Sequence, residues 1–297
     1  EYDYWMDRSA AGSGHAVRMA DGSILNRYCD QLSEPRPEAF AIDEAVARRV
    51  DRPAAEVYRN LRSAAESGWD FSSRWLSDPR RIETIRTTDF IPIDLNCLLY
   101  GMERTLARMA EVGGDPDRAL GLRRAAEERR AALERYCWAE GSGFFCDYDL
   151  RSRAACLRPT LAGLFPLYAG LASPEQARAS AEKVAAKFLA PGGLVTSLEA
   201  SGQQWDWPNG WAPLQWVAVV GLQRYGFAAL AETIARRWIQ LNRDVYERTG
   251  RLMEKYNVVD LTKEAGGGEY PTQDGFAWTN GVLLALLERY PPQRSPA

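Results

Sequence analysis

The candidates for acid–base chemistry in this chain are carboxylates, because its 297 residues include a single histidine. A Ser-His-Asp or Cys-His mechanism would depend on His15 alone, which disfavours both. Asp70 is the first candidate: it follows Gly68, which permits a tight turn, and lies between Trp69 and Trp75. Tryptophans that exclude water raise the pKa of a carboxyl group, as a general acid near neutral pH requires.

Each candidate carboxylate also has a simpler, structural interpretation. Asp70 could pair with Arg74, four residues further on. Glu254, the second candidate, could pair with its neighbours Lys255 or Arg251. Because such ion pairs are common, the case for catalysis depends on the motifs around these residues.

The segment 203–213 has the composition of a sugar-binding loop. It places the tryptophans Trp205, Trp207 and Trp211, the carboxylate Asp206 and two prolines in a turn that leads into a helix. Aromatic faces and a fixed carboxylate suit a sugar, which has apolar C–H faces and a rim of hydroxyls. The alternative is a set of core tryptophans at the start of a helix.

Two further motifs could contact a hydroxylated ligand. Arg36-Pro37-Glu38 fixes an arginine on a rigid turn, where Arg36 could donate a forked pair of hydrogen bonds to a hydroxyl or a catalytic carboxylate. The glycines 266–268 allow close approach of the backbone and place Glu269 where it could accept sugar hydroxyls. A surface arginine and a flexible connector are the respective alternatives.

Composition excludes several classes of function. Charged residues make up 26% of the chain and the net charge is −3, so no basic field points to nucleic acid. No apolar run of about 18 residues predicts a membrane span. The five cysteines have no C-x-x-C spacing, which disfavours a structural zinc site. We therefore expect no metal, no nucleic acid and no membrane partner.

Outside these motifs the sequence pattern is helical. We expect a single domain over 1–297, with an irregular arm over 1–37 and a small β-hairpin near 139–150. Nine helices are predicted at about 42–49, 54–66, 95–109, 115–133, 160–171, 174–190, 211–225, 227–249 and 275–289.

The motifs fall in the breaks between these helices. An α/α toroid has this pattern, since its helices form a ring whose loops converge on a pocket at one end. Periodicity alone equally allows an open helical solenoid.

Taken together, the motifs resemble those of the trehalases of glycoside hydrolase family 37, inverting enzymes that split α,α-trehalose into two glucoses. The resemblance extends from Tyr4 to about residue 290. The matching segments are 25–28, 36–38, 66–70, 92–96, 203–213, 254–256 and 266–281.

The resemblance implies that Asp70 is the general acid and Glu254 the general base. It implies an all-α (α/α)6 toroid, trehalose and glucose as ligands, and no cofactor. Together with the motifs, it predicts the substrate-binding residues Arg36, Pro37, Glu38, Gly68, Trp69, Trp205, Asp206, Trp211 and Glu269.

The chain departs from the family pattern in one respect. The family's Pro-Gly-Gly-Arg-Phe signature is absent, and nine helices are fewer than the twelve of a closed ring. Glu1–Met6 has neither an initiator methionine nor the features of a signal peptide. We therefore expect the C-terminal part of a trehalase-like toroid that is incomplete, with the missing N-terminal segment as a further partner; periplasm and cytoplasm both remain open.

Three functions are compatible with this pattern. The first is trehalose hydrolysis by an inverting acid–base mechanism. The second is sugar binding by a truncated homologue that does not catalyse. The third is an (α/α)6 glycosidase acting on another α-glucoside, against which the segment 203–213 and the glycine-rich loop argue.

Overall fold

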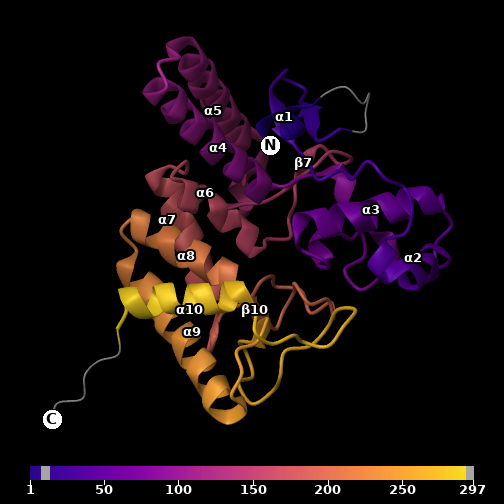
Figure 1. Cartoon of the computed structure of the whole chain (residues 1–297), viewed down its shortest axis with the longest axis vertical. Helices are drawn as coiled ribbons and strands as arrows, with labels where there is room; N and C mark the ends of the chain where they lie inside the picture. Colours follow the sequence, from indigo (N-terminus) through magenta and orange to yellow (C-terminus); the bar gives the residue numbers. More distant parts are fainter. Residues whose placement is uncertain (8–13, 292–297) are drawn as a thin grey trace.

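The computed structural model describes residues 1–7 and 14–291, and in this part of the chain it contains ten α-helices and eleven short strands (Figure 1). The helices are α1 (Tyr2–Met6), α2 (Phe40–Ala47), α3 (Ala54–Ser67), α4 (Ile93–Val112), α5 (Pro116–Cys137), α6 (Phe165–Ala169), α7 (Pro174–Lys183), α8 (Ala212–Arg224), α9 (Ala228–Thr249) and α10 (Ala277–Arg289). The strands are β1 (Ala16–Arg18), β2 (Ile24–Asn26), β3 (Phe90–Ile91), β4 (Trp138–Ala139), β5 (Phe144–Phe145), β6 (Tyr148–Asp149), β7 (Ala154–Ala155), β8 (Leu189–Ala190), β9 (Gly193–Leu194), β10 (Asn209–Trp211) and β11 (Lys255–Asn257). The predicted all-α class is confirmed.

Local capping signals in the sequence set several helix ends. Asp115 caps α5 by accepting a hydrogen bond from the first turn, and Pro116 occupies the first helical position. Ser173 and Gln176 form a reciprocal capping box at the start of α7. α3 ends at Gly68, which has a left-handed φ of 74°.

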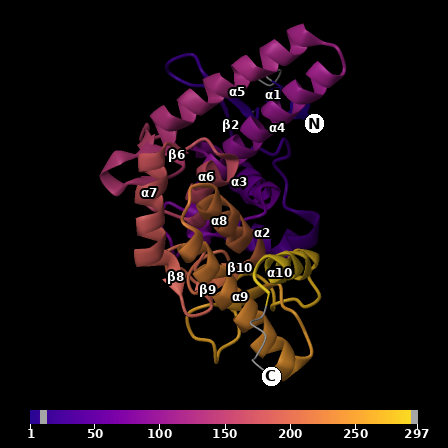
Figure 2. The same cartoon turned by 90° about the vertical axis from the view of Figure 1, so that its left-hand side faces the viewer.

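Four helices form a row, because α4 contacts α6, α6 contacts α8, and α8 contacts α10. α5 packs against α4, and α9 packs against both α8 and α10. Figure 1 shows α4 and α5 at one end of the molecule and α9 and α10 at the other. In Figure 2 the α4–α5 hairpin extends well past the remaining helices. The motifs around Asp70, the tryptophans and Glu254 lie in the loops that precede α4, α8 and α10, whereas Arg36-Pro37-Glu38 precedes α2.

A short antiparallel pair joins two motifs that are distant in sequence. β10 pairs with β11 so that Trp211 lies opposite Lys255 and Gly210 opposite Tyr256. Gly210 is required here, since a Cβ would lie 2.5 Å from the Val258 side chain. This pairing brings the tryptophan-rich segment beside Glu254, the residue before β11.

The structure corrects the prediction of an irregular arm over 1–37. In the described part of this arm, the first residues form α1, and β1 pairs with β2 in a hairpin with Ala16 opposite Asn26. Polar contacts hold these elements in place: Tyr2 donates to Glu103 of α4, and the Asn26 amide donates to the Trp5 carbonyl oxygen. The arm was predicted to be irregular because its Gly- and Ser-rich composition does not reveal such long-range partners.

The hairpin predicted near 139–150 is present over a shorter span. β4 pairs with β5, whereas β6 pairs with β3 and β7 in a separate three-stranded sheet. Within the described ranges, no helix combines the length and apolar character needed to cross a bilayer.

Candidate active site

Asp70 is a half-buried carboxylate in the loop after α3. Burial raises its pKa from 3.8 to about 6, and the negative charges of Glu269 and Glu254 act in the same direction. The positive charge of Arg36 lowers this pKa in part. Three residues from distant segments therefore act on the charge of Asp70, as expected if they share one site.

Arg74 is not the partner of Asp70, which removes the simpler interpretation of that carboxylate. The Arg74 guanidinium donates to both oxygens of Asp94 and of Asp147 at 2.7–2.8 Å. It also lies 4.6 Å from the centroid of the Trp69 ring and 4.3 Å from that of Trp75. This buried cation supports the tryptophans on either side of Asp70 and leaves the Asp70 carboxylate free of that pairing.

Glu254 is buried, with 2% of its surface exposed, and both carboxylate oxygens accept hydrogen bonds. The Lys255 ammonium donates to Oε2 at 2.8 Å, and the Tyr270 hydroxyl donates to Oε1 at 3.2 Å. The predicted ion pair with Lys255 is therefore present. It does not exclude catalysis, because hydrogen bonds of this kind also orient a carboxylate that acts as a general base.

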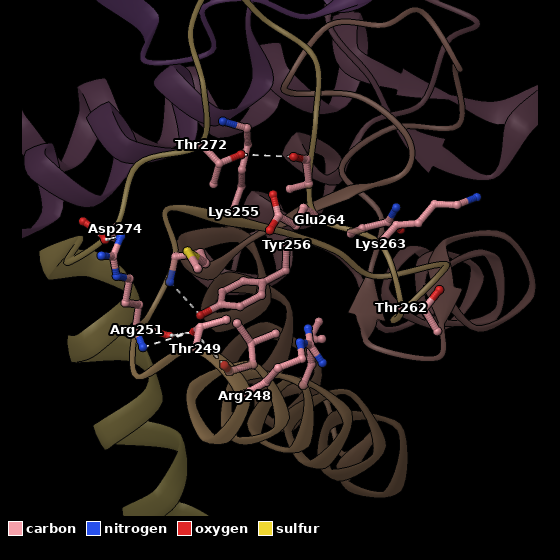
Figure 3. A pocket seen from close by; sticks show the side chains of 15 residues that line it. Arg248, Thr249, Arg251, Lys255, Tyr256, Thr262, Lys263, Glu264, Thr272 and Asp274 are labelled. Carbon is pink, nitrogen blue, oxygen red and sulfur yellow. Dashed lines mark hydrogen bonds and ion pairs between the residues drawn. The ribbon is translucent and has the colours of Figure 1, made fainter.

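The turn that carries Glu254 is fixed by its own strand. The Tyr256 hydroxyl accepts a hydrogen bond from the Met253 N–H at 2.9 Å (Figure 3). The Glu254 N–H donates to the Gln273 carbonyl oxygen at 2.9 Å. Tyr256 lines a cavity of about 300 Å³ together with residues from the end of α9, β11 and the segment 262–265. Figure 3 shows the Tyr256 side chain among these residues.

Gln204 and Tyr270 connect the main chain of Asp70 with the carboxylate of Glu254. The Gln204 amide nitrogen donates to the main-chain carbonyl oxygen of Asp70 and, at 3.2 Å, to the Tyr270 hydroxyl. That hydroxyl in turn donates to Glu254. Asp70 and Glu254, 184 residues apart in the sequence, thus belong to one hydrogen-bond network.

Arg36 and Glu269 meet across the site. Arg36 forms a forked pair with Asp43, and its Nη2 donates to both Glu269 oxygens at 3.1 and 3.2 Å. The pair Arg36–Asp43 fixes the guanidinium, which contacts the Glu269 carboxylate instead of Asp70. Pro37 and Glu38 are exposed on the 3-10 turn Pro37–Ala39.

The glycine-rich loop packs closely on the tryptophan-rich segment. A Cβ on Gly267 would lie 2.4 Å from the Gly202 carbonyl oxygen, and one on Gly268 would lie 3.0 Å from Gln204. Both glycines have positive φ, so other residues would be strained there. Two of the three glycines predicted to approach a ligand therefore approach the protein itself, Gly267 the main chain at Gly202 and Gly268 the Gln204 side chain. These contacts position Glu269 and Tyr270.

The tryptophans predicted to bind sugar form a buried stack. Trp205 lies between Trp69, at a centroid distance of 5.1 Å, and Trp211, at 3.8 Å, and Trp278 packs edge-on. Trp211 is 1% exposed, so the structure corrects the prediction that it offers a face to substrate. Only Trp207 of the 203–213 segment is an exposed tryptophan, at 41%.

Asp206 is also corrected, from a substrate-binding residue to a structural one. Its side chain is fully buried and accepts hydrogen bonds from the Ser72 and Ser197 hydroxyls and the Ser73 N–H at 2.7–2.8 Å, and from Ser201. Four donors satisfy the carboxylate, which leaves it no role toward a sugar. It instead ties the loop after Asp70 to the tryptophan-rich segment.

Asp206→Ala is expected to destabilise the fold, because it leaves three buried donors and the half-buried Ser201 hydroxyl without an acceptor. We expect the free energy of unfolding to fall by at least about 2 kcal/mol. Urea unfolding measures this, with Asp117→Ala on the exposed start of α5 as a control that changes it by about 1 kcal/mol or less. An equal effect of both substitutions would contradict the structural role of Asp206.

The sequence analysis did not assign three residues to the site: Gln204, Tyr270, and Lys255 as the hydrogen-bond partner of a catalytic Glu254. Each lies beside a predicted residue, but no spacing distinguishes Gln204 from Gln203 or marks a tyrosine hydroxyl as a bridge. The described residues hold no group of three or more His, Cys, Asp or Glu side chains arranged to bind a metal ion.

The row of helices and the candidate carboxylate site can be compared with those of solved structures. The chain is similar to the neutral trehalase of Saccharomyces cerevisiae, with a TM-score of 0.74 and 25% identity over 96% of this chain and 55% of the other. It shares its fold with a family 63 mannosylglycerate hydrolase of Thermus thermophilus, with a TM-score of 0.55 and 20% identity over 88% and 76% of the two chains. The class is that of helical glycoside hydrolase folds.

Sequence comparison identifies the family. The Trehalase family model matches residues 1–291. A periplasmic trehalase of Pseudomonas aeruginosa is 52% identical over 98% of this chain and 54% of its own length. One of Xanthomonas axonopodis is 49% identical over all of this chain and 53% of its own length. The chain belongs to the trehalase family and spans about half the length of the curated relatives it matches.

Proposed function

We propose that this chain carries the catalytic carboxylates of a protein that hydrolyses α,α-trehalose to two glucose molecules with inversion at the anomeric carbon. The observation that carries the proposal is the network in which Gln204 and Tyr270 join the segments of Asp70 and Glu254. Within it, burial raises the pKa of the Asp70 carboxyl, whereas the Glu254 carboxylate is paired with the Lys255 ammonium. These different surroundings support the acid role for Asp70 and the base role for Glu254.

Asp70 acts as the general acid. The bond between the two glucose units of trehalose breaks with difficulty unless the departing oxygen receives a proton. A pKa of about 6 leaves Asp70 partly protonated near neutral pH, whereas an ordinary aspartic acid would be ionised.

Glu254 acts as the general base. It takes a proton from a water molecule that attacks the anomeric carbon from the face opposite Asp70, which inverts that centre. Inversion requires the two carboxyl groups to stand roughly 6.5–9.5 Å apart, so that the water fits between substrate and base. Tyr270 uses one lone pair of Oε1, and the other remains for the water.

Other residues of the site hold the sugar hydroxyls. Glu269 accepts hydroxyl hydrogens from its place beside Arg36. The Gln204 Oε1 atom is buried without a partner among the described residues, so a sugar hydroxyl or a water would satisfy it. Next to these residues, an open cavity of about 380 Å³ borders Phe71, Gly268 and Glu269.

The rate of hydrolysis is expected to fall as pH rises through about 6. Asp70 must carry a proton to act, and its raised pKa places the loss of that proton near pH 6 instead of near 4. Measuring kcat for trehalose from pH 4 to 9 checks this. A rate that stays constant up to pH 8 would contradict Asp70 as the acid.

Glucose release from trehalose tests the proposed function. Because the chain spans about half the length of its relatives, it is assayed alone and joined to the part of the Pseudomonas aeruginosa relative outside the match. Glucose release by the joined protein supports the proposal. If neither form releases glucose while trehalose still binds, the non-catalytic sugar-binding function is correct instead. Parallel assays with maltose and kojibiose expose a different α-glucoside as substrate.

A further inference from the structure

A basic cavity lies at the carboxyl-terminal ends of α4, α6 and α8, away from the motif loops. Its volume is about 690 Å³. The charged residues that line it are Arg104, Arg108, Arg123, Arg224 and Glu111. We call it the arginine cavity.

Most of this positive charge has no counter-charge. Glu111 pairs with Arg123. Among the described residues, Arg104, Arg108 and Arg224 form no ion pair with a carboxylate. The whole chain has a net charge of −3, so the excess of positive charge at this cavity is a local feature and does not reflect a basic protein.

Two of these arginines repel each other within one helix. Arg104 and Arg108 are four residues apart on the same face of α4, an arrangement of like charges that destabilises a helix. The Arg104 guanidinium is within 3.5 Å of the buried Tyr100 hydroxyl, a neutral partner only. An anion between the guanidinium groups would remove the repulsion.

The Arg224 side chain extends over Gly170, at the end of α6. Its Nη1 lies 2.5 Å from where a Cβ on Gly170 would be, so the guanidinium passes close over Gly170. As the last residue of α8, Arg224 interacts favourably with the helix dipole. This explanation does not extend to Arg104, which lies two turns before the end of α4.

We propose that the arginine cavity binds a small anion that carries phosphate groups. Guanidinium groups match phosphate oxygens with forked pairs of hydrogen bonds, and several of them from different helices suit more than one phosphate. Thr105 and Tyr168 line the same cavity. This site is independent of the proposed hydrolysis.

The arginine cavity and the sugar site are at opposite ends of α8. This helix runs from Ala212, beside the tryptophan stack, to Arg224, and its 13 residues span about 20 Å. A ligand in the arginine cavity therefore does not compete with a sugar for space.

Isothermal titration of the full chain with pyrophosphate tests the proposal. We expect saturable binding that weakens as salt is added, because the contacts are between exposed charges. Arg104→Ser combined with Arg224→Ser is expected to lower the affinity at least tenfold. The matched control, Arg243→Ser on the exposed face of α9, is expected to leave it unchanged.

Four results would overturn the proposal. They are no saturable binding to the unaltered chain, equal binding by the double variant, an equal loss in the control, and binding of a hexaglutamate peptide without binding of pyrophosphate. Thermal unfolding of each variant verifies that it is folded, and none of the three exposed arginines is expected to be needed for folding.

Discussion

Asp70→Asn is expected to lower kcat for trehalose by about 10²–10⁴-fold in the form of the protein that releases glucose. The asparagine keeps the size of the side chain but has no proton of suitable acidity for the departing oxygen. The loss follows from the raised pKa of Asp70, which exists only because the folded protein buries that carboxyl group. Stopped assays of glucose release at pH 5 to 7 measure it.

The stability of the same variant separates chemistry from folding. A carboxyl whose pKa is raised in the folded state binds its proton more tightly there than in the unfolded chain, so its ionisation opposes folding above about pH 6. Asp70→Asn removes that charge, and the free energy of unfolding at pH 7 is expected to hold or rise. Near-normal activity, or a loss of activity that only follows unfolding, would refute the acid assignment.

Glu254→Gln is expected to cause a loss of similar size, about 10²–10⁴-fold in kcat, with trehalose binding largely intact. It differs from Asp70→Asn in its cost to the fold. The substitution leaves the Lys255 ammonium, which is 1% exposed, without its carboxylate partner. Breaking a buried pair in this way costs about 3–5 kcal/mol. Activity and urea unfolding are measured on the same preparation.

A double variant isolates the catalytic part of that effect. Lys255→Met added to Glu254→Gln removes the unpaired buried charge, so we expect much of the stability to return while the activity does not. If activity returned together with stability, Glu254 would be a structural residue and the base would be another group.

Local sequence signals predicted the helices well. The caps at Asp115 and Ser173 and the left-handed end at Gly68 depend on residues within one turn of the helix end, so they follow from the sequence alone. The arm over 1–37 was predicted less well, because α1 and the β1–β2 hairpin depend on contacts with helices that lie far away in sequence.

The assignment of individual side chains within the motifs was less reliable than the motifs themselves. Asp206 and Trp211 belong to the segment with the clearest binding pattern, yet both are buried. The Asp206 carboxylate accepts four hydrogen bonds from the protein, and the Trp211 ring stacks on another tryptophan. Neither side chain needs a ligand as its partner. Composition cannot tell whether a partner will be a ligand or another part of the same chain.

The sequence by itself determined the helical class, the family, and the short list of carboxylates from which an acid and a base must come. Only the tertiary structure decided which of them share a site. It separated Asp70 from Arg74 and linked the main chain of Asp70 to Glu254 through Gln204 and Tyr270. It also buried the side chain of Asp206 in the protein interior. The physical reason is that charge–charge interactions and hydrogen bonds depend on distance in space and not on separation along the chain. Residues 184 positions apart enter one network only when the chain folds.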